Sequence, residues 1–201
     1  MTIADVASTV PSSANRLRDL LRTATCEVHE RLHHHSGLAA VQRGIIDRRA
    51  YTALLARLYG FHRPFEAVVR SAPDRTRWLE TDLTALGVDC FASSALPRCL
   101  ALPPTASREY RLGGRYVIEG SALGGRSLGR QLDGLLGVGV LAGRRFFTGH
   151  GAATGDVWRD YLAHLEAVPD LPLRYAAVVD GAIQTFRIFE QWLEGWDESH
   201  E

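Results

Sequence analysis

RYVIEGSALGGRSLGRQ, residues Arg115–Gln131, combines many glycines with an apolar spacing that is typical of a helix. Each glycine inside a helix costs about 1 kcal/mol relative to alanine, so this run needs a reason to exist. On a helical wheel of about 100° per residue, Gly113, Gly120 and Gly124 fall on one narrow face, with Ser121 on its flank. A face without side chains lets a flat, bulky group lie against the backbone and lets the helix bend over it. Close packing of another helix, or a loop, is the alternative interpretation.

Length, charge and cysteine spacing limit the class of protein. The chain has 201 residues, 46% of them hydrophobic, which is enough for one domain with a full core. Basic and acidic residues both number 23, so binding to nucleic acid is not expected. Cys26, Cys90 and Cys99 have no metal-site spacing and are expected to be free thiols in a reducing compartment. The N-terminus does not resemble a secretory signal, and no apolar run approaches the ~20 residues of a membrane span. We therefore expect a cytoplasmic protein without a membrane partner.

Helical periodicity and capping residues predict an all-α single domain, because no convincing segment alternates with a period of two. The first helix is expected to start at Pro11–Ser13 and to stop at Ser36-Gly37. The remaining helices are expected from the Asp47 cap to Val68 with a kink at Pro64, over Asp74–Leu86 before Gly87, from the Ser107 cap to about Leu136, over Asp156–Ala167 with Thr154 as cap, and from Pro172 to Leu193. Residues 88–106 and 137–153 are expected to be irregular connections.

The first helix carries a candidate ligand at the edge of its apolar stripe. That stripe consists of Leu17, Leu21, Ala24, Val28 and Leu32. His29 lies about 100° from its centre, on the same flank as Arg18 and Arg22. This arrangement suits a flat metallocofactor whose iron meets the histidine and whose carboxylates meet the guanidinium groups. A partly exposed histidine without a ligand role is the alternative.

The same helix contains a second motif, because residues 29–33 match HExxH, the signature of zinc proteases. Such enzymes place a substrate-binding sheet before the helix, and no strand is predicted in the residues before His29. Zinc hydrolysis is therefore a minor alternative. The run from His33 to His35 is interpreted as a solvated helix end.

Three segments together resemble the haem oxygenases. LRTATCEVHERLH (Leu21–His33) is similar to their proximal helix, YVIEGSALGGRSL (Tyr116–Leu128) to their glycine-rich distal helix, and IFEQWL (Ile188–Leu193) to their last helix. The similarity is greatest to the bacterial type that supplies biliverdin to bacteriophytochromes. The resemblance implies a haem-oxygenase-like helical bundle over residues 16–197 with a kinked distal helix. A flexible N-terminus (1–15) and a C-terminal tail (198–201) would flank it.

The resemblance also implies roles for individual residues. His29 would be the axial iron ligand, and Gly120 and Gly124 would lie against the haem face. Further haem contacts are expected from Arg22 and, with less support, Arg18 and Arg159 near the propionates, and from Thr25, Val117 and Gly125. Ser121 stands where the mammalian pattern has an aspartate that organises water, so Gly120, Ser121 and Gly124 form the expected catalytic set. His33 stands where the family often has a carboxylate, which leaves the partner of His29 unidentified; Glu119 and Arg126 are not expected to reach the iron.

The implied activity is cleavage of haem b, both cofactor and substrate, at a meso carbon to biliverdin, carbon monoxide and ferrous iron. The reaction would need O2 and electrons from a ferredoxin or reductase, since no flavin or nicotinamide motif is present. A bacteriophytochrome would accept the bilin. Two alternatives stay open: a non-catalytic haem or bilin carrier on the same fold, which Ser121 keeps in view, and a thiaminase-like or di-iron relative, for which no paired ExxH motifs are found.

Overall fold

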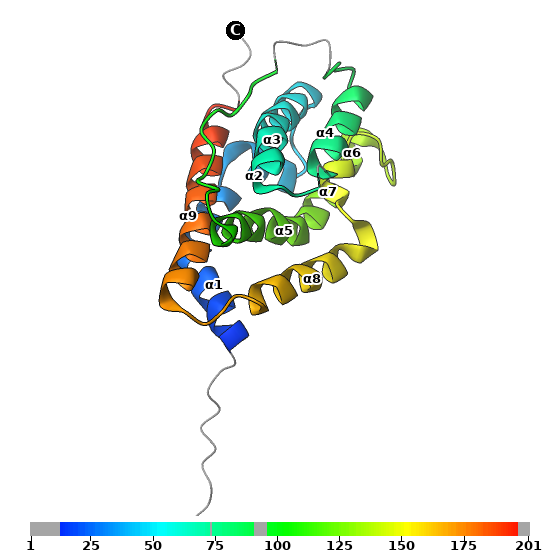
Figure 1. Ribbon diagram of the computed structural model, residues 1–201. Coiled ribbons are helices and arrows are strands. Elements are labelled where there is room, and N and C mark those ends of the chain that lie inside the picture. Colours follow the sequence, from blue (N-terminus) through cyan, green and yellow to red (C-terminus); the bar gives the residue numbers. More distant parts are fainter. Residues whose placement is uncertain (1–12, 73, 91–95, 197–201) are drawn as a thin grey trace, which may run out of the picture.

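The computed structural model describes residues 13–72, 74–90 and 96–196, and within these ranges it contains helices and no strand. The helices are α1 (Ser13–His33), α2 (Ser36–Gln42), α3 (Arg48–Val69), α4 (Asp74–Ala85), α5 (Arg108–Gln131), α6 (Asp133–Leu136), α7 (Arg145–Thr148), the short 3-10 helix η1 (Gly151–Ala153), α8 (Thr154–Glu166) and α9 (Pro172–Glu194) (Figure 1). The all-α prediction is confirmed. None of these helices is long and apolar enough to cross a membrane. Residues 1–12 and 197–201, which include most of the predicted N-terminus and the whole predicted tail, lie outside the described ranges.

The glycine-rich helix α5 lies in the middle of the bundle, against α9 on one side and α8 on another (Figure 1). Where α5 meets α9, the two backbones nearly touch. A Cβ atom on Gly113 would lie 2.0 Å from the carbonyl oxygen of Val178, and one on Gly181 would lie 2.4 Å from that of Tyr110. The alternative interpretation, close helix packing, is therefore correct for Gly113. This glycine does not share an open face with Gly124, because α9 covers Gly113 whereas a Cβ atom on Gly124 would meet nothing within 4 Å.

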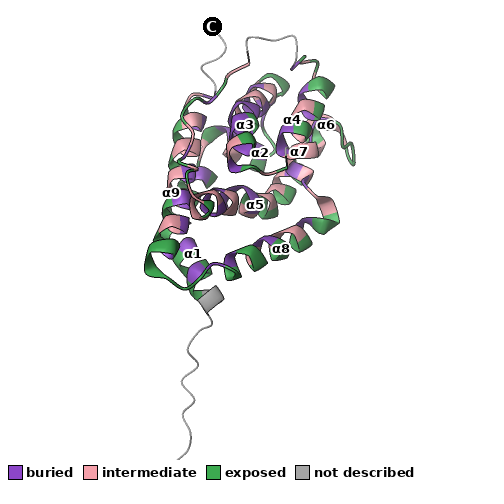
Figure 2. Ribbon diagram, in the orientation of Figure 1, coloured by how far each residue is buried: buried purple, intermediate pink, exposed green. Residues whose placement is uncertain are grey.

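The apolar stripe of α1 faces the core as predicted, with one correction. Leu17, Leu21, Val28 and Leu32 are buried, but Ala24 is exposed and Thr25 is buried in its place. α1 is rotated slightly about its axis relative to the predicted orientation, so Thr25 faces the core. Its buried hydroxyl donates a hydrogen bond to the Leu21 carbonyl at 2.8 Å. Both α1 and α8 alternate buried and exposed residues along their length, as expected for helices at the surface of the bundle (Figure 2).

The end of the first helix differs from the prediction. α1 ends at His33, and Ser36-Gly37 begins the separate helix α2 instead of a loop. The reason is a local cap, since the His35 side chain accepts a hydrogen bond from the backbone N–H of Leu38. The imidazole thereby acts as an N-cap, a role that is usually given to Ser, Thr, Asp or Asn.

The glycine-rich helix ends at Gln131, before the predicted Leu136, and α6 follows as a separate turn. The buried guanidinium of Arg144 forms hydrogen bonds with the carbonyl groups at this end of the helix. It donates to the carbonyl oxygens of Gly129, Leu132 and Gly137 and to the Asp133 carboxylate. Carbonyls that a side chain satisfies need no further helical turn. α5 itself is one continuous helix, and its kink stays a prediction.

The connection over 137–153 was expected to be irregular but contains α7 and η1. Asp82, from α4, accepts hydrogen bonds from the backbone N–H groups of Arg145 and Phe146 at 2.6 and 2.8 Å, and thereby begins α7. Thr154 is not the cap of α8; it is the first helical residue, and its hydroxyl donates to the Gly151 carbonyl.

The other predicted helix ends agree with the structure. Asp47 and Ser107 cap α3 and α5 through their side chains, and Pro172 opens α9. α3 continues through Pro64 as one helix, and Gly87 follows α4 with a positive φ of 91°. Residues 88–90 and 96–106 contain no helix or strand, as predicted, and the remainder of that connection lies outside the described ranges.

His62 is a buried titratable group in α3, and its burial is expected to lower the stability of the fold at acidic pH. Burial lowers its pKa to about 3, and the positive charge of Arg75 adds to this effect. The folded protein keeps the ring neutral, whereas the unfolded chain binds a proton below the ordinary pKa of 6.5. The stabilisation is complete above pH 6.5. We predict that it is lost by about 1.4 kcal/mol per pH unit as the pH falls from there towards 3.

The control for this prediction removes the titrating group. Burial raises the pKa of Asp82 to about 6, which stabilises the fold on acidification and partly masks the effect of His62. The free energy of unfolding should therefore be measured by denaturant titration for the wild type and His62→Phe at several pH values. Below pH 6.5, the free energy of unfolding of the variant should rise steadily relative to that of the wild type. Parallel curves would show that His62 does not titrate in this way.

Candidate functional site

His29 lies on the exposed flank of α1, as the helical wheel predicts. Its ring stands edge-on to the ring of His33, with centroids 4.6 Å apart, and edge-on to Phe186 of α9 at 6.4 Å. Partial burial lowers the pKa of His29, the charge of His33 lowers it further, and Glu30 opposes both. The lowered pKa favours the neutral imidazole, which is the form in which a histidine binds a metal.

The open glycine face of α5 consists of Gly120 and Gly124. A Cβ atom on Gly124 would have no heavy atom within 4 Å, and one on Gly120 would meet only the Trp158 ring at 3.7 Å. Gly125, which the sequence placed in the same site, faces another way, because its Cβ atom would lie 3.2 Å from the Phe147 carbonyl oxygen. The face is thus open at Gly124, where a flat group has room against the backbone, and is bounded at Gly120 by the indole of Trp158.

α1 comes close to α5 at Thr25 and Tyr116, because Thr25 lies near enough to the Tyr116 hydroxyl to lower its pKa. Burial raises the pKa of Tyr116, while Thr25 and the charges of Arg18 and Arg22 oppose the shift, so both arginines lie near this contact. His29 is one helical turn beyond Thr25, and Gly120 is one turn beyond Tyr116. Each therefore lies about 6 Å along its own helix from the point where the two helices come close.

The other residues predicted for the site are at its edges or beneath it. Arg18 and Arg22 are exposed, and Arg22 makes a loose ion pair with Asp19 at 3.7 Å. Arg159 is exposed on α8 and pairs with Asp156. Val117 is buried in the main hydrophobic core. Because the arginines are exposed, they can exchange solvent or their surface partners for an anionic group, whereas Val117 contributes packing.

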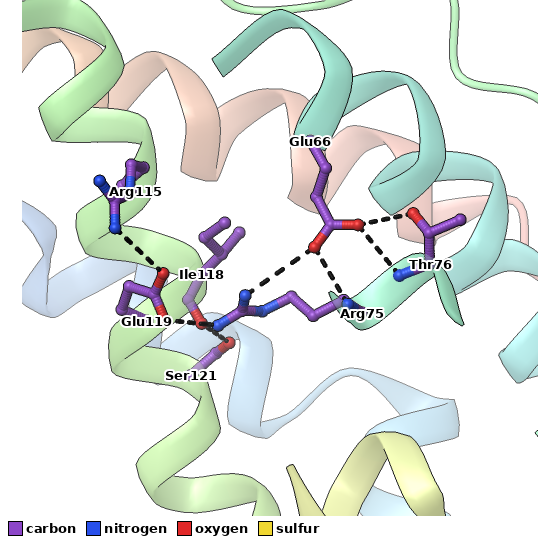
Figure 3. A network of polar contacts seen from close by, with 7 residues as sticks. All are labelled: Glu66, Arg75, Thr76, Arg115, Ile118, Glu119 and Ser121. Atoms are coloured by element: carbon purple, nitrogen blue, oxygen red, sulfur yellow. Dashed lines mark hydrogen bonds and ion pairs between the residues drawn. The ribbon is translucent and has the colours of Figure 1, made fainter. Parts of the chain in front are cut away.

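A buried network of charges lies against the same part of α5 and links it to α3 and α4 (Figure 3). Arg75 of α4 donates to the Glu119 carboxylate at 2.7 Å and forms an ion pair with Glu66 at 3.9 Å. Glu66 also accepts from the backbone N–H groups of Arg75 and Thr76 at 3.0 Å each, so it caps the start of α4. Burial raises the pKa of Glu66, and these hydrogen bonds oppose the shift. Arg115 completes the network with a contact to Glu119 at 3.7 Å.

The network ends at the backbone beside Ser121. The carbonyl oxygen of Ile118 accepts hydrogen bonds from Arg75 at 3.0 Å and from the Ser121 hydroxyl at 2.8 Å (Figure 3). Ser121 is exposed, so its hydroxyl lies where the buried network meets solvent. Glu119 points to Arg75, and its distance from the iron stays a prediction.

Several residues around this site were not predicted from the sequence: Glu66, Arg75, Tyr116 and Trp158. Glu66 gave a usable signal, because a carboxylate next to Phe65 in the apolar stripe of α3 needs a buried partner. The identity of that partner depends on how α4 packs, which the sequence pattern does not contain. Trp158 had no such signal, since a tryptophan in a helix is usually core.

The end of α1 borders a cleft of about 650 Å³, lined by Glu30, His33, His34, Ser36, Ala39, Gln42 and Arg43. Within the described ranges, no group of three or more histidine, cysteine, aspartate or glutamate residues is arranged to hold a metal ion. A zinc site built on the HExxH match thus finds no support in the described residues. A metal carried by its own ring system needs only one protein ligand, such as His29.

The family model described as heme oxygenase matches residues 15–195 of this chain. In fold, the chain is similar to a heme oxygenase from Leptospira interrogans, with 17% identity, a TM-score of 0.70, and 91% of this chain and 98% of the other covered. It is also similar to heme oxygenase-1 from the cyanobacterium Synechocystis sp. PCC6803 in complex with heme, with 15% identity, a TM-score of 0.72, and coverage of 94% and 93%. No curated protein sequence shows significant similarity to this one.

Proposed function

This chain belongs to the haem oxygenase family and is a haem-degrading oxidoreductase, and from that premise we propose that it cleaves haem at a meso carbon to biliverdin, carbon monoxide and ferrous iron. The observation that supports this proposal is the placement of His29 on α1 and of the glycine face on α5, which is open at Gly124. His29 and Gly120 each lie four residues beyond the point where Thr25 comes close to Tyr116, and burial lowers the pKa of His29. The haem would supply the iron that activates O2 and the ring that is oxidised.

The residues of this chain would bind and orient the haem. His29 would hold it on the α1 side, and Arg18 and Arg22 would pair with its propionates through charge-assisted hydrogen bonds. Gly120 and Gly124 would let the ring lie against α5 and keep side chains out of the space where O2 enters. The Ser121 hydroxyl would hold an ordered water near that space, since it is exposed and carries both a donor and acceptor lone pairs.

The finer parts of the proposal concern the other participants. Electrons would come from a separate ferredoxin or reductase in the cytoplasm, and a bacteriophytochrome would take up the biliverdin. A haem or bilin carrier without turnover is not favoured, because the match over residues 15–195 is to an enzyme family.

Aerobic turnover tests the proposal directly. Purified protein loaded with haem should be given ascorbate or a ferredoxin system in air, and its spectrum followed. The Soret band should decay to a biliverdin spectrum, with carbon monoxide and iron released in equal amounts. If the haem complex is reduced but its Soret band persists for a time in which many rounds of haem degradation should have occurred, the proposal is contradicted.

The contrast between two glycines of α5 gives a further prediction. Gly113→Ala places a methyl group 2.0 Å from the Val178 carbonyl oxygen, so it should destabilise the fold by about 3 kcal/mol or more. Gly124→Ala meets nothing within 4 Å and should stabilise the haem-free protein by up to about 1 kcal/mol. The same methyl group would occupy the space proposed for haem and O2, so haem degradation by Gly124→Ala should fall sharply.

Gly134→Ala, in α6, is the matched control because its methyl group also meets open space. Denaturant unfolding and haem turnover should be measured for all three variants. If Gly124→Ala degrades haem as fast as Gly134→Ala does, the glycine face is not where haem lies.

A further inference from the structure

The open glycine face has a wall at one end. Gly120 is covered only by the indole of Trp158, whose ring atoms Cη2 and Cζ3 would each lie 3.7 Å from a Cβ atom at that position. One turn further along, Gly124 has no neighbour within 4 Å. A flat group against this face can therefore extend past Gly124 but is stopped by Trp158 beside Gly120. The two ends of the face are sterically different.

Trp158 is held in place by an aromatic cluster. It stacks on Tyr161 of the same helix, with centroids 5.4 Å apart and planes inclined by 26°, and meets Tyr116 of α5 at 5.7 Å. Tyr161 is fully buried, and its hydroxyl donates to the Leu112 carbonyl at 2.9 Å, while Arg115 lies over its ring at 5.7 Å. α8 runs alongside α5 in Figure 1, and these contacts fix the position of the indole relative to the glycine face.

The same cluster extends towards α1, because Thr25 of α1 lies near enough to the Tyr116 hydroxyl to lower its pKa. The wall, the glycine face and the helix that carries His29 thus share one set of contacts. An indole held in this way is a rigid stop, since Trp158 cannot turn away without losing its stack on Tyr161. Its side chain is only half buried, so one part of it is available to a ligand.

We propose that Trp158 is a specificity-determining residue: its indole contacts the bound haem at one edge and thereby decides which meso carbon lies over the reacting side of the glycine face. This inference rests on the proposed function. If alanine replaced Trp158, the bound haem could rotate or slide towards α8. A change of this size in an apolar wall alters discrimination between two binding modes by about tenfold or more.

The first test measures contact without turnover. Zinc protoporphyrin has the flat ring and the propionates of haem, but its metal has no redox chemistry. On its binding, the ring current should shift the indole N–H resonance of Trp158 more than those of the other three tryptophans, Trp78, Trp192 and Trp196, with Trp158→Phe used for assignment. A Trp158 resonance that moves no more than the others would overturn the proposal, whether or not the protein degrades haem.

The second test measures the product. Trp158→Ala should change the ratio of biliverdin isomers by about tenfold or more, and Trp158→Phe should change it less. Trp192→Phe, in α9, is the matched control. That indole is also held by specific contacts, since it donates to the Arg57 carbonyl at 2.7 Å and lies under the Arg57 guanidinium, but these contacts are with α3 and not with the glycine face. Lower thermal stability with an unchanged isomer ratio would show a purely structural role for Trp158. Absence of haem degradation in the wild type would count against the proposed function instead, and the zinc protoporphyrin result would still decide this inference.

Discussion

Haem degradation by His29→Ala is expected to fall by more than about 100-fold, because residues that merely support a metal ligand already account for about 10–100-fold when they are removed. His29 lies one helical turn beyond Thr25, which is near Tyr116 of α5, and partial burial together with His33 lowers the pKa of His29. Without it, the iron would have no protein ligand on the α1 side. The optical spectrum of the haem complex and its rate of turnover check this expectation.

Two controls separate loss of the ligand from loss of the fold. Added imidazole should restore a substantial part of the turnover by entering the space left by the side chain. His33→Ala should keep the spectrum of the wild type, because it removes only the ring that stands 4.6 Å away. Turnover at the wild-type rate by His29→Ala without imidazole would rule out His29 as the ligand.

Arg75→Met is expected to lower the free energy of unfolding by about 3–5 kcal/mol, the usual cost of leaving buried charges without their partner. Glu66 and Glu119 are 1% and 7% exposed, and both depend on this guanidinium. The Ile118 carbonyl would also lose its bond from α4. Since that carbonyl lies just before Gly120, hydrogen exchange of the backbone amides around Ser121 should become faster as well.

Glu119→Gln is the matched control for this prediction. The amide oxygen of glutamine can still accept from Arg75 at the same place, so the loss of stability should be smaller than that of Arg75→Met. Denaturant titration at pH 7 gives both values. A loss below about 1 kcal/mol for Arg75→Met would show that the network contributes no more than a surface ion pair does.

The sequence predicted those parts of the fold that depend on local chemistry. Asp47 and Ser107 cap the backbone three residues ahead of them, so their helix starts could be predicted without a tertiary structure. The end of α5 and the start of α7 could not, because Arg144 and Asp82 satisfy backbone groups that are remote in sequence. The burial of Thr25 instead of Ala24 likewise could not be predicted, because it depends on how α1 is rotated about its axis relative to the neighbouring helices.

The candidate site shows the same limit. The period of the glycines was visible in the sequence, but not which of them another helix covers: Gly113 lies against α9 and Gly124 against nothing. Both glycines have the same local sequence signal, and only the packing of α9 distinguishes them. The link from Ser121 through Ile118 to Arg75 was invisible for the same reason, since Arg75 comes from a helix whose position the pattern does not give.

The structure of the complex with ferric haem is the most direct measurement of the central claim. We expect the iron to be bonded to a ring nitrogen of His29, the opposite face of the ring to lie against the backbone at Gly120 and Gly124, and the propionates to point towards Arg18 and Arg22. A haem that lies elsewhere, for instance in the cleft beside His33 and His34, or one whose iron has another protein ligand, would contradict the site described above.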